Sequence, residues 1–194
     1  MKRRVALAAL VALAALAPAQ AATTYSLDKN HSEVSFQIRH LVSKVRGVFH
    51  DFDAKVVQDD ANPTASSVEF RIQAASIDTG LEKRDDELRS ASFFDVANHP
   101  EIVFESKAVE KIADSQYRVT GDLTIHGVTR AITLPVTFGG EMSAPGGGTA
   151  AGFSTEVTLD RRDFGIVWNR ELDNGGMLLG DEVAVTINLS VRKQ

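Results

Sequence analysis

Apolar and polar residues alternate along much of this chain, and the clearest case is the stretch of residues 121–138. Leu123 and Ile125 alternate with polar neighbours before Gly127, and the same alternation resumes after it. Apolar side chains at every second position indicate strands with one buried and one exposed face. Gly127 lies in the short polar break, where a tight turn needs a positive φ. The stretch therefore predicts a long antiparallel hairpin, in which Pro135, without an N–H group, suits an edge-like or bulged position.

The same alternation recurs elsewhere, and together these segments predict about eight strands. They cover residues 33–39, 45–57, 67–74, 101–107, 117–125, 132–138, 153–160 and 182–192. The phase of the second segment is mixed, which a bend or bulge near Gly47 would explain. Antiparallel strands with one apolar face each must bury those faces together, in a closed barrel or a two-sheet sandwich. Long strands and short connections favour an all-β, eight-stranded antiparallel up-and-down barrel, whose interior is filled by side chains or holds one small ligand.

One short helix is predicted near residues 80–91. The residues from Thr79 to Glu82 match a capping box, and Leu81 and Leu88 lie two turns apart in an otherwise charged segment. Because this helix has few apolar residues, we expect it to pack against another part of the fold.

The N-terminal segment matches a secretory signal peptide. Basic residues 2–4 precede an apolar stretch at residues 5–17, and an Ala-x-Ala site ends at Ala21. The apolar stretch is shorter than the roughly 20 residues that a membrane-spanning helix needs. We therefore expect residues 1–21 to be cleaved and the mature chain to leave the cytoplasm. Residues 22–194 are then expected to form a single domain, because the strand pattern resumes after each glycine-rich loop.

The charge balance narrows the classes of partner. Cleavage would remove three of the 21 basic residues and none of the 26 acidic ones, which shifts the formal net charge from −5 to −8. A protein this acidic is not expected to bind nucleic acid, because phosphate recognition needs clustered Lys and Arg. No polybasic run remains for docking on anionic lipid. The chain has no cysteine, so outside the cytoplasm its stability must come from a hydrophobic core instead of disulfides.

An exported barrel has an alternative arrangement, in which the apolar face points outward into a membrane. Membrane barrels carry girdles of Tyr and Trp at both interfaces, whereas this chain has two Tyr and one Trp. Its ten Phe residues lie largely at apolar positions within the predicted strands. The composition therefore favours a barrel with an apolar interior and no stable membrane insertion, and cell fractionation distinguishes the two arrangements.

The five histidines raise the question of a metal site, but their spacing does not support one. The sequence contains no H-E-x-x-H or His-x-His motif and no cysteine ligand. It also lacks a nucleophile-elbow serine and a phosphate-binding loop. No catalytic or metal-binding residue is therefore predicted, and a site gathered from separate strands stays open. The alternative function is a hydrolase or metal-dependent enzyme with His and Asp residues at the barrel rim, which a bound metal lost on His126→Ala would indicate.

Several stretches, in order along the chain, resemble the YceI-like family of periplasmic, polyisoprenoid-binding proteins. They are residues 28–36, 47–52, 88–96, 99–106, 121–129 and 162–165, followed by the last strand. The strongest match is Gly121-Asp122-Leu123-Thr124-Ile125-His126-Gly127-Val128-Thr129, and the resemblance covers essentially all of the chain after the signal peptide. One departure is small, since Gly47-Val48-Phe49 stands where the family often has Gly-Thr-Phe.

The resemblance implies a lipocalin-like eight-stranded barrel that takes an isoprenoid tail, such as that of a quinone or a polyprenyl carrier, into its lumen. It implies a binding or carrier protein of the periplasm, not an enzyme, whose ligand is a non-covalently bound isoprenoid or similar amphiphile. No other cofactor is expected, and a homodimer is left open. The residues on the apolar strand faces are the predicted lumen contacts, although ordinary core packing explains each one equally well. They are Val34, Phe36, Ile38, Val68, Phe70, Ile72, Ile102, Phe104, Leu123, Ile125, Ile132, Leu134, Val136, Phe153, Val157, Val185 and Ile187.

The barrel mouth has its own candidates. Phe93 and Phe94 follow the helix and are flanked by polar residues, so we interpret them as a plug that the helix carries over one barrel end. The alternative is a plain anchor of the helix onto the sheet. Trp168 is a second mouth candidate. The candidates for contact with a ligand head group are Arg39, Arg162 and Asp163.

Overall fold

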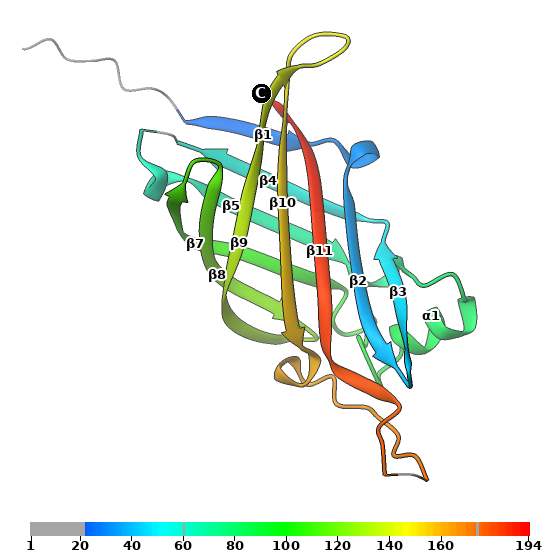
Figure 1. Ribbon diagram of the computed structural model, residues 1–194. Helices are drawn as coiled ribbons and strands as arrows, with labels where there is room; N and C mark the ends of the chain where they lie inside the picture. The colour runs from blue at the N-terminus through cyan, green and yellow to red at the C-terminus, as the bar shows by residue number, and fades with distance from the viewer. Residues whose placement is uncertain (1–21, 60, 174) are drawn as a thin grey trace, which may run out of the picture.

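The computed structural model describes residues 22–59, 61–173 and 175–194, and the predicted signal peptide lies outside this part of the chain (Figure 1). The strands are β1 (Thr23–Leu27), β2 (Glu33–His40), β3 (Ser43–Phe49), β4 (Phe52–Gln58), β5 (Ser67–Gln73), β6 (Ile77–Asp78), β7 (Glu101–Ala113), β8 (Gln116–Ile125), β9 (Val128–Ser143), β10 (Thr149–Asp160) and β11 (Leu179–Lys193). The helices are α1 (Glu82–Arg89) and the short 3₁₀ turns η1 (Lys29–His31), η2 (Pro63–Ala65), η3 (Ala74–Ser76) and η4 (Arg161–Phe164).

Counted over the described residues, the barrel has eight positions around its circumference, each of which we call a wall. A wall is either one long strand or, in three cases, two short strands that lie end to end. One end of β11 pairs with β1 and the rest with β2, so β1 and β2 form one wall. β3 and β4 form the next wall, since they pair with β2 and β1 respectively. β5 and β6 form the third, opposite β4 and β3. Each wall pairs with its neighbours in sequence and β11 closes the sheet onto the first wall, which confirms the predicted up-and-down barrel.

The predicted central hairpin is formed by β8 and β9. Ile125 pairs with Val128, and the two residues between them, His126 and Gly127, both have positive φ values of 51° and 73°. A two-residue loop in which both residues have the left-handed backbone conformation forms a type I′ turn, whose twist matches that of the flanking strands. Pro135 pairs with β8, but the register of β9 with β10 begins only at the next residue, so Pro135 does occupy an edge-like position.

The bend expected near Gly47 is at a different place. The chain turns at His50 and Asp51, between β3 and β4, and Gly47 lies within β3. A Cβ atom at Gly47 would lie 2.4 Å from the ring of Phe36, so this glycine allows the close packing of an aromatic side chain. The short strand β1 was not predicted, because its apolar alternation is too brief to stand out.

The helix is confirmed, but its predicted capping box is wrong. Leu81 occupies the position before the first helical residue and its side chain caps nothing. Instead Asp85, which is buried, accepts hydrogen bonds from the backbone N–H and the hydroxyl of Thr79. Arg89 ties the other end of α1 to the barrel by donating to the carbonyls of Ala75 and Ile77 at 2.9 and 2.8 Å.

The buried side chains form two clusters inside the barrel. The larger one includes Phe52, Phe70 and Phe104, and the smaller one gathers around Tyr25 and Val191 where β1 meets the end of β11. Among the described residues, no helix has both the length and the apolar character required to cross a membrane.

Candidate functional site: an apolar cavity in the barrel

The barrel encloses a cavity of about 580 Å³, within the size range of small-molecule sites. Apolar side chains from all eight walls line it, because the strand alternation turns one face of every wall inward. All seventeen residues predicted as lumen contacts lie on its surface. Their position is therefore established, while their contact with a ligand remains a prediction.

The cavity is long compared with its volume. Leu179 and Leu189, near opposite ends of β11, both line it. At ~3.3 Å per residue these two positions are roughly 33 Å apart along the strand. The charged side chains of the lining, by contrast, lie at one end only, around α1 and the segment that follows β10. They are Lys83, Arg84, Glu87 and Arg161.

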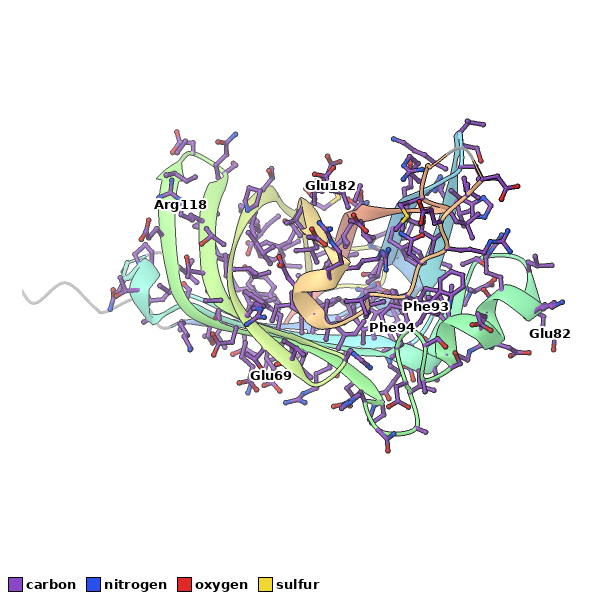
Figure 2. The ribbon with its side chains drawn as sticks, turned by 90° about the horizontal axis from the view of Figure 1, so that it is seen from below. Glu69, Glu82, Phe93, Phe94, Arg118 and Glu182 are labelled. Carbon is purple, nitrogen blue, oxygen red and sulfur yellow. The ribbon has the colours of Figure 1, made fainter. Side chains whose placement is uncertain are left out.

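Phe93 and Phe94 both line the cavity at the α1 end, as the plug interpretation requires. Phe93 is buried, with its ring centroid 5.2 Å from that of Trp168. The ring of Phe94 meets Phe49 edge-on at 6.0 Å. In Figure 2, which looks at this end, both phenylalanines lie between α1 and the segment after β10. Trp168 itself is 38% exposed, so it stands between the cavity and solvent.

Arg161 holds this end together, and sequence reasoning missed it. Its side chain is only 5% exposed and donates to the carbonyls of Ile166 and Trp168 at 2.7 and 2.8 Å. It also donates to Gly180 O at 2.9 Å and to the carboxylate of Asp181 at 3.1 Å. Burial lowers the pKa of Arg161, and the neighbouring carboxylate opposes that effect. The guanidinium thus fixes the loop that carries Trp168.

The three predicted head-group residues do not line the cavity. Arg39 donates instead to the backbone carbonyls of Leu41, Met177 and Leu179, which fastens β2 to the start of β11. Arg162 pairs with Asp160, and its hydrogen bonds lower the pKa of that carboxyl to about 2. Asp163 is exposed, and its backbone carbonyl accepts from Arg130.

Several polar residues also line the cavity, and Thr155 among them has a feature that the sequence did not indicate. Thr155 lies on the inward face of β10, opposite Val136 and Ile187. Its hydroxyl oxygen is buried and has no hydrogen-bond partner among the described residues. An unsatisfied hydroxyl in an apolar cavity is a point where a bound molecule gains by offering a polar group.

Outside the cavity, the structure brings together three ligand-type side chains at the same barrel end. Asp95, His99 and His126 each offer a ligand atom, and these atoms lie within 4.8 Å of one another. All three side chains are partly buried, and none lines the cavity. The sequence left a site from separate segments open, but its spacing gave no sign of this one.

The fold and the cavity define a lipocalin-like β-barrel with a largely apolar interior cavity. The chain belongs to the YceI-like family, since the model of the YceI-like domain matches residues 25–191. It is similar to a UPF0312 protein from Ectopseudomonas mendocina, with 44% identity over 165 residues that cover 83% of this chain and 86% of the relative.

Solved structures share the barrel. The YCEI protein of Campylobacter jejuni is 30% identical with a TM-score of 0.69, and the match covers 87% of this chain and 96% of that one. BcnA of Burkholderia cenocepacia is 27% identical with a TM-score of 0.75, covering 84% and 98%. A domain from Saccharophagus degradans, described as polyisoprenoid-binding and implicated in plant cell wall breakdown, is 17% identical with a TM-score of 0.62, covering 88% and 98%. This last likeness concerns the fold alone.

Proposed function

We propose that this protein binds one isoprenoid lipid, such as a quinone or a polyprenyl carrier, in the periplasm and holds its tail inside the barrel. The observation that carries the proposal is the shape and chemistry of the cavity, which is long, lined by apolar side chains and charged at one end only. A long amphiphile has the same distribution of apolar and polar groups. Its tail fits the apolar length, and its head group belongs near Lys83, Arg84 and Glu87.

The energetics allow useful affinity without a catalytic group. Burying several hundred Å² of a prenyl tail contributes on the order of 10 kcal/mol at ~25 cal/mol per Å². Ordering the tail and losing its translational freedom offset a large part of this. Micromolar binding needs a net of about 8 kcal/mol, which this balance brings within reach.

The family supports the ligand class. The Saccharophagus domain with the same fold is described as polyisoprenoid-binding. The N-terminal segment, with its signal-peptide pattern, supports export to the periplasm. We propose binding without a reaction, because most side chains along the length of the cavity are apolar and the charged ones lie at its end.

The test has two arms. Purified mature protein is extracted with organic solvent and the extract is analysed by mass spectrometry, and delipidated protein is titrated with a fluorescent farnesyl or geranylgeranyl alcohol. We expect a long-chain lipid in the extract and saturable binding of one probe per chain. A protein that carries no lipid and binds neither probe does not have this function.

A further inference from the structure

The cluster of Asp95, His99 and His126 is built from two segments that meet at the α1 end of the barrel. Asp95 and His99 belong to the segment between α1 and β7, while His126 is in the tight turn between β8 and β9. Their ligand atoms lie within 4.8 Å of one another. None of the three lines the lipid cavity, so the proposed lipid binding leaves them without a role.

The side chains are oriented by neighbouring groups. Nδ1 of His126 lies 3.3 Å from the backbone carbonyl oxygen of Phe164, which accepts a hydrogen bond when this nitrogen carries the proton. Nε2 then keeps its lone pair for another partner. Asp95 accepts a hydrogen bond on Oδ2 from the side-chain amide of Asn98 at 2.9 Å, which holds the carboxylate in place. Metal-binding histidines and carboxylates are typically held by such outer partners.

The backbone is adapted to this arrangement. Asp95 and His126 have positive φ values of 46° and 51°, which non-glycine residues seldom adopt. The backbone N–H of His99 donates to the carbonyl of Asp95 at 2.8 Å, so the two side chains come from one compact turn. A Cβ atom on Gly127 would lie 2.5 Å from the His99 ring, so the glycine makes room for the second imidazole. The two imidazoles pack edge to face at 5.0 Å between ring centroids.

We propose that Asp95, His99 and His126 form a site for a divalent transition-metal ion, with Zn²⁺ as its best-matched occupant. Two imidazoles and one carboxylate are a ligand set that Zn²⁺ accepts, with water in the fourth position. Tetrahedral ligand atoms at about 2.1 Å from one ion lie about 3.4 Å apart, so atoms that are as much as 4.8 Å apart must close inward by up to about 1.4 Å. Side-chain rotation supplies that movement, since all three are only partly buried.

The site would fasten together the parts that close the barrel. Asp95 directly follows the plug residue Phe94, and the carbonyl that orients His126 belongs to η4, which begins the loop that carries Trp168. A bound ion therefore ties the plug segment to the β8–β9 turn. The inference does not rest on the proposed lipid function, and it is tested with the metal alone.

The experiment titrates the metal-free, full-length mature protein with Zn²⁺ by isothermal calorimetry. The ligand variants are Asp95→Asn, His99→Gln and His126→Asn, of which the two asparagines tolerate the positive φ at their positions. The matched control is His50→Asn, because His50 is paired with Asp78 at 3.0 Å on the exposed surface but belongs to no group of three ligand-type side chains among the described residues. Circular dichroism checks the fold of each variant.

We expect one Zn²⁺ per wild-type chain, an affinity at least about tenfold weaker in each ligand variant, and an unchanged affinity in the control. A second measurement uses wild-type protein and so does not depend on the folding of any variant. In its NMR spectra, Zn²⁺ should shift the ring resonances of His99 and His126 and leave those of His50 unchanged. The proposal is overturned by a wild-type protein that binds no Zn²⁺. It is equally overturned if Zn²⁺ moves the His50 resonances instead, or if the control weakens binding as much as the ligand variants.

Discussion

The substitution Ile187→Asp tests the cavity most directly, because it places a carboxylate on the middle of its wall. Ile187 lines the cavity from β11, opposite Thr155 on one neighbouring strand and Val34 on the other. The matched control is Asn188→Asp, which makes a nearly isosteric change at the next residue on the outer, exposed face of the same strand.

The expected loss of affinity follows from burial of the new carboxylate. Water in the lipid-free cavity hydrates it, and an entering tail removes that water. Burial raises a carboxyl pKa, and a hydrogen bond from the Thr155 hydroxyl directly opposite offsets part of that rise; a net rise from about 4 to about 7 corresponds to about 4 kcal/mol and a roughly thousandfold weaker binding at pH 7. Because ligand binding raises the pKa, the complex holds the proton more tightly than the free protein does. Affinity should therefore recover by about tenfold for each pH unit between 7 and 4.

The assay is a titration of delipidated wild type, Ile187→Asp and Asn188→Asp with a fluorescent geranylgeranyl alcohol at pH 7, 6 and 5. We expect the inner variant alone to lose affinity and to regain it in acid. Equal affinities of the three proteins at pH 7, or an equal loss in the outer variant, would show that the tail does not enter the barrel.

Three further changes probe the structure. Arg161→Met should lower the free energy of unfolding by about 3–5 kcal/mol, because it removes the guanidinium that contacts buried carbonyls and Asp181. At the exposed neighbouring position, Arg162→Met should lower it by at most about 1 kcal/mol. Urea denaturation measures both. Thr155→Val removes a buried hydroxyl that has no hydrogen-bond partner in the described part of the chain, and it should raise the free energy of unfolding by about 1 kcal/mol. An unchanged denaturation midpoint contradicts this expectation. Gly127→Ala should lower the thermal midpoint more than Gly146→Ala, since both have positive φ but only the former places a Cβ against a histidine ring; equal shifts would refute that contact.

The sequence predicted the wall residues well because alternation at every second position is a local signal that the barrel preserves. Phe70, for example, lies between the charged residues Glu69 and Arg71 and faces the cavity. Where the alternation was mixed, as around Phe49, the lining residue was missed. Local motifs were less reliable. The predicted capping box does not form, because Thr79 instead donates its backbone N–H to the carboxylate of Asp85.

The features that sequence reasoning could not find depend on contacts between distant segments. Arg161 looks like part of a charged loop, and only its backbone carbonyl partners reveal that it is buried. Likewise, His99 and His126 belong to no ligand motif, since the β8–β9 turn and the segment between α1 and β7 meet only in the folded barrel. The turn itself was predictable, because Gly127 marked it.

The incomplete pairing of β9 with β10 has a consequence for how a molecule leaves the interior. Their register ends at Val136 and Thr155, and beyond that point each strand is paired only with its other neighbour. Separating β9 from β10 where they are not paired breaks fewer hydrogen bonds than separating two strands that are paired along their full length. For the proposed lipid ligand, this weakly paired flank would provide a sideways exit that avoids a lengthwise withdrawal past the aromatic rings at the α1 end.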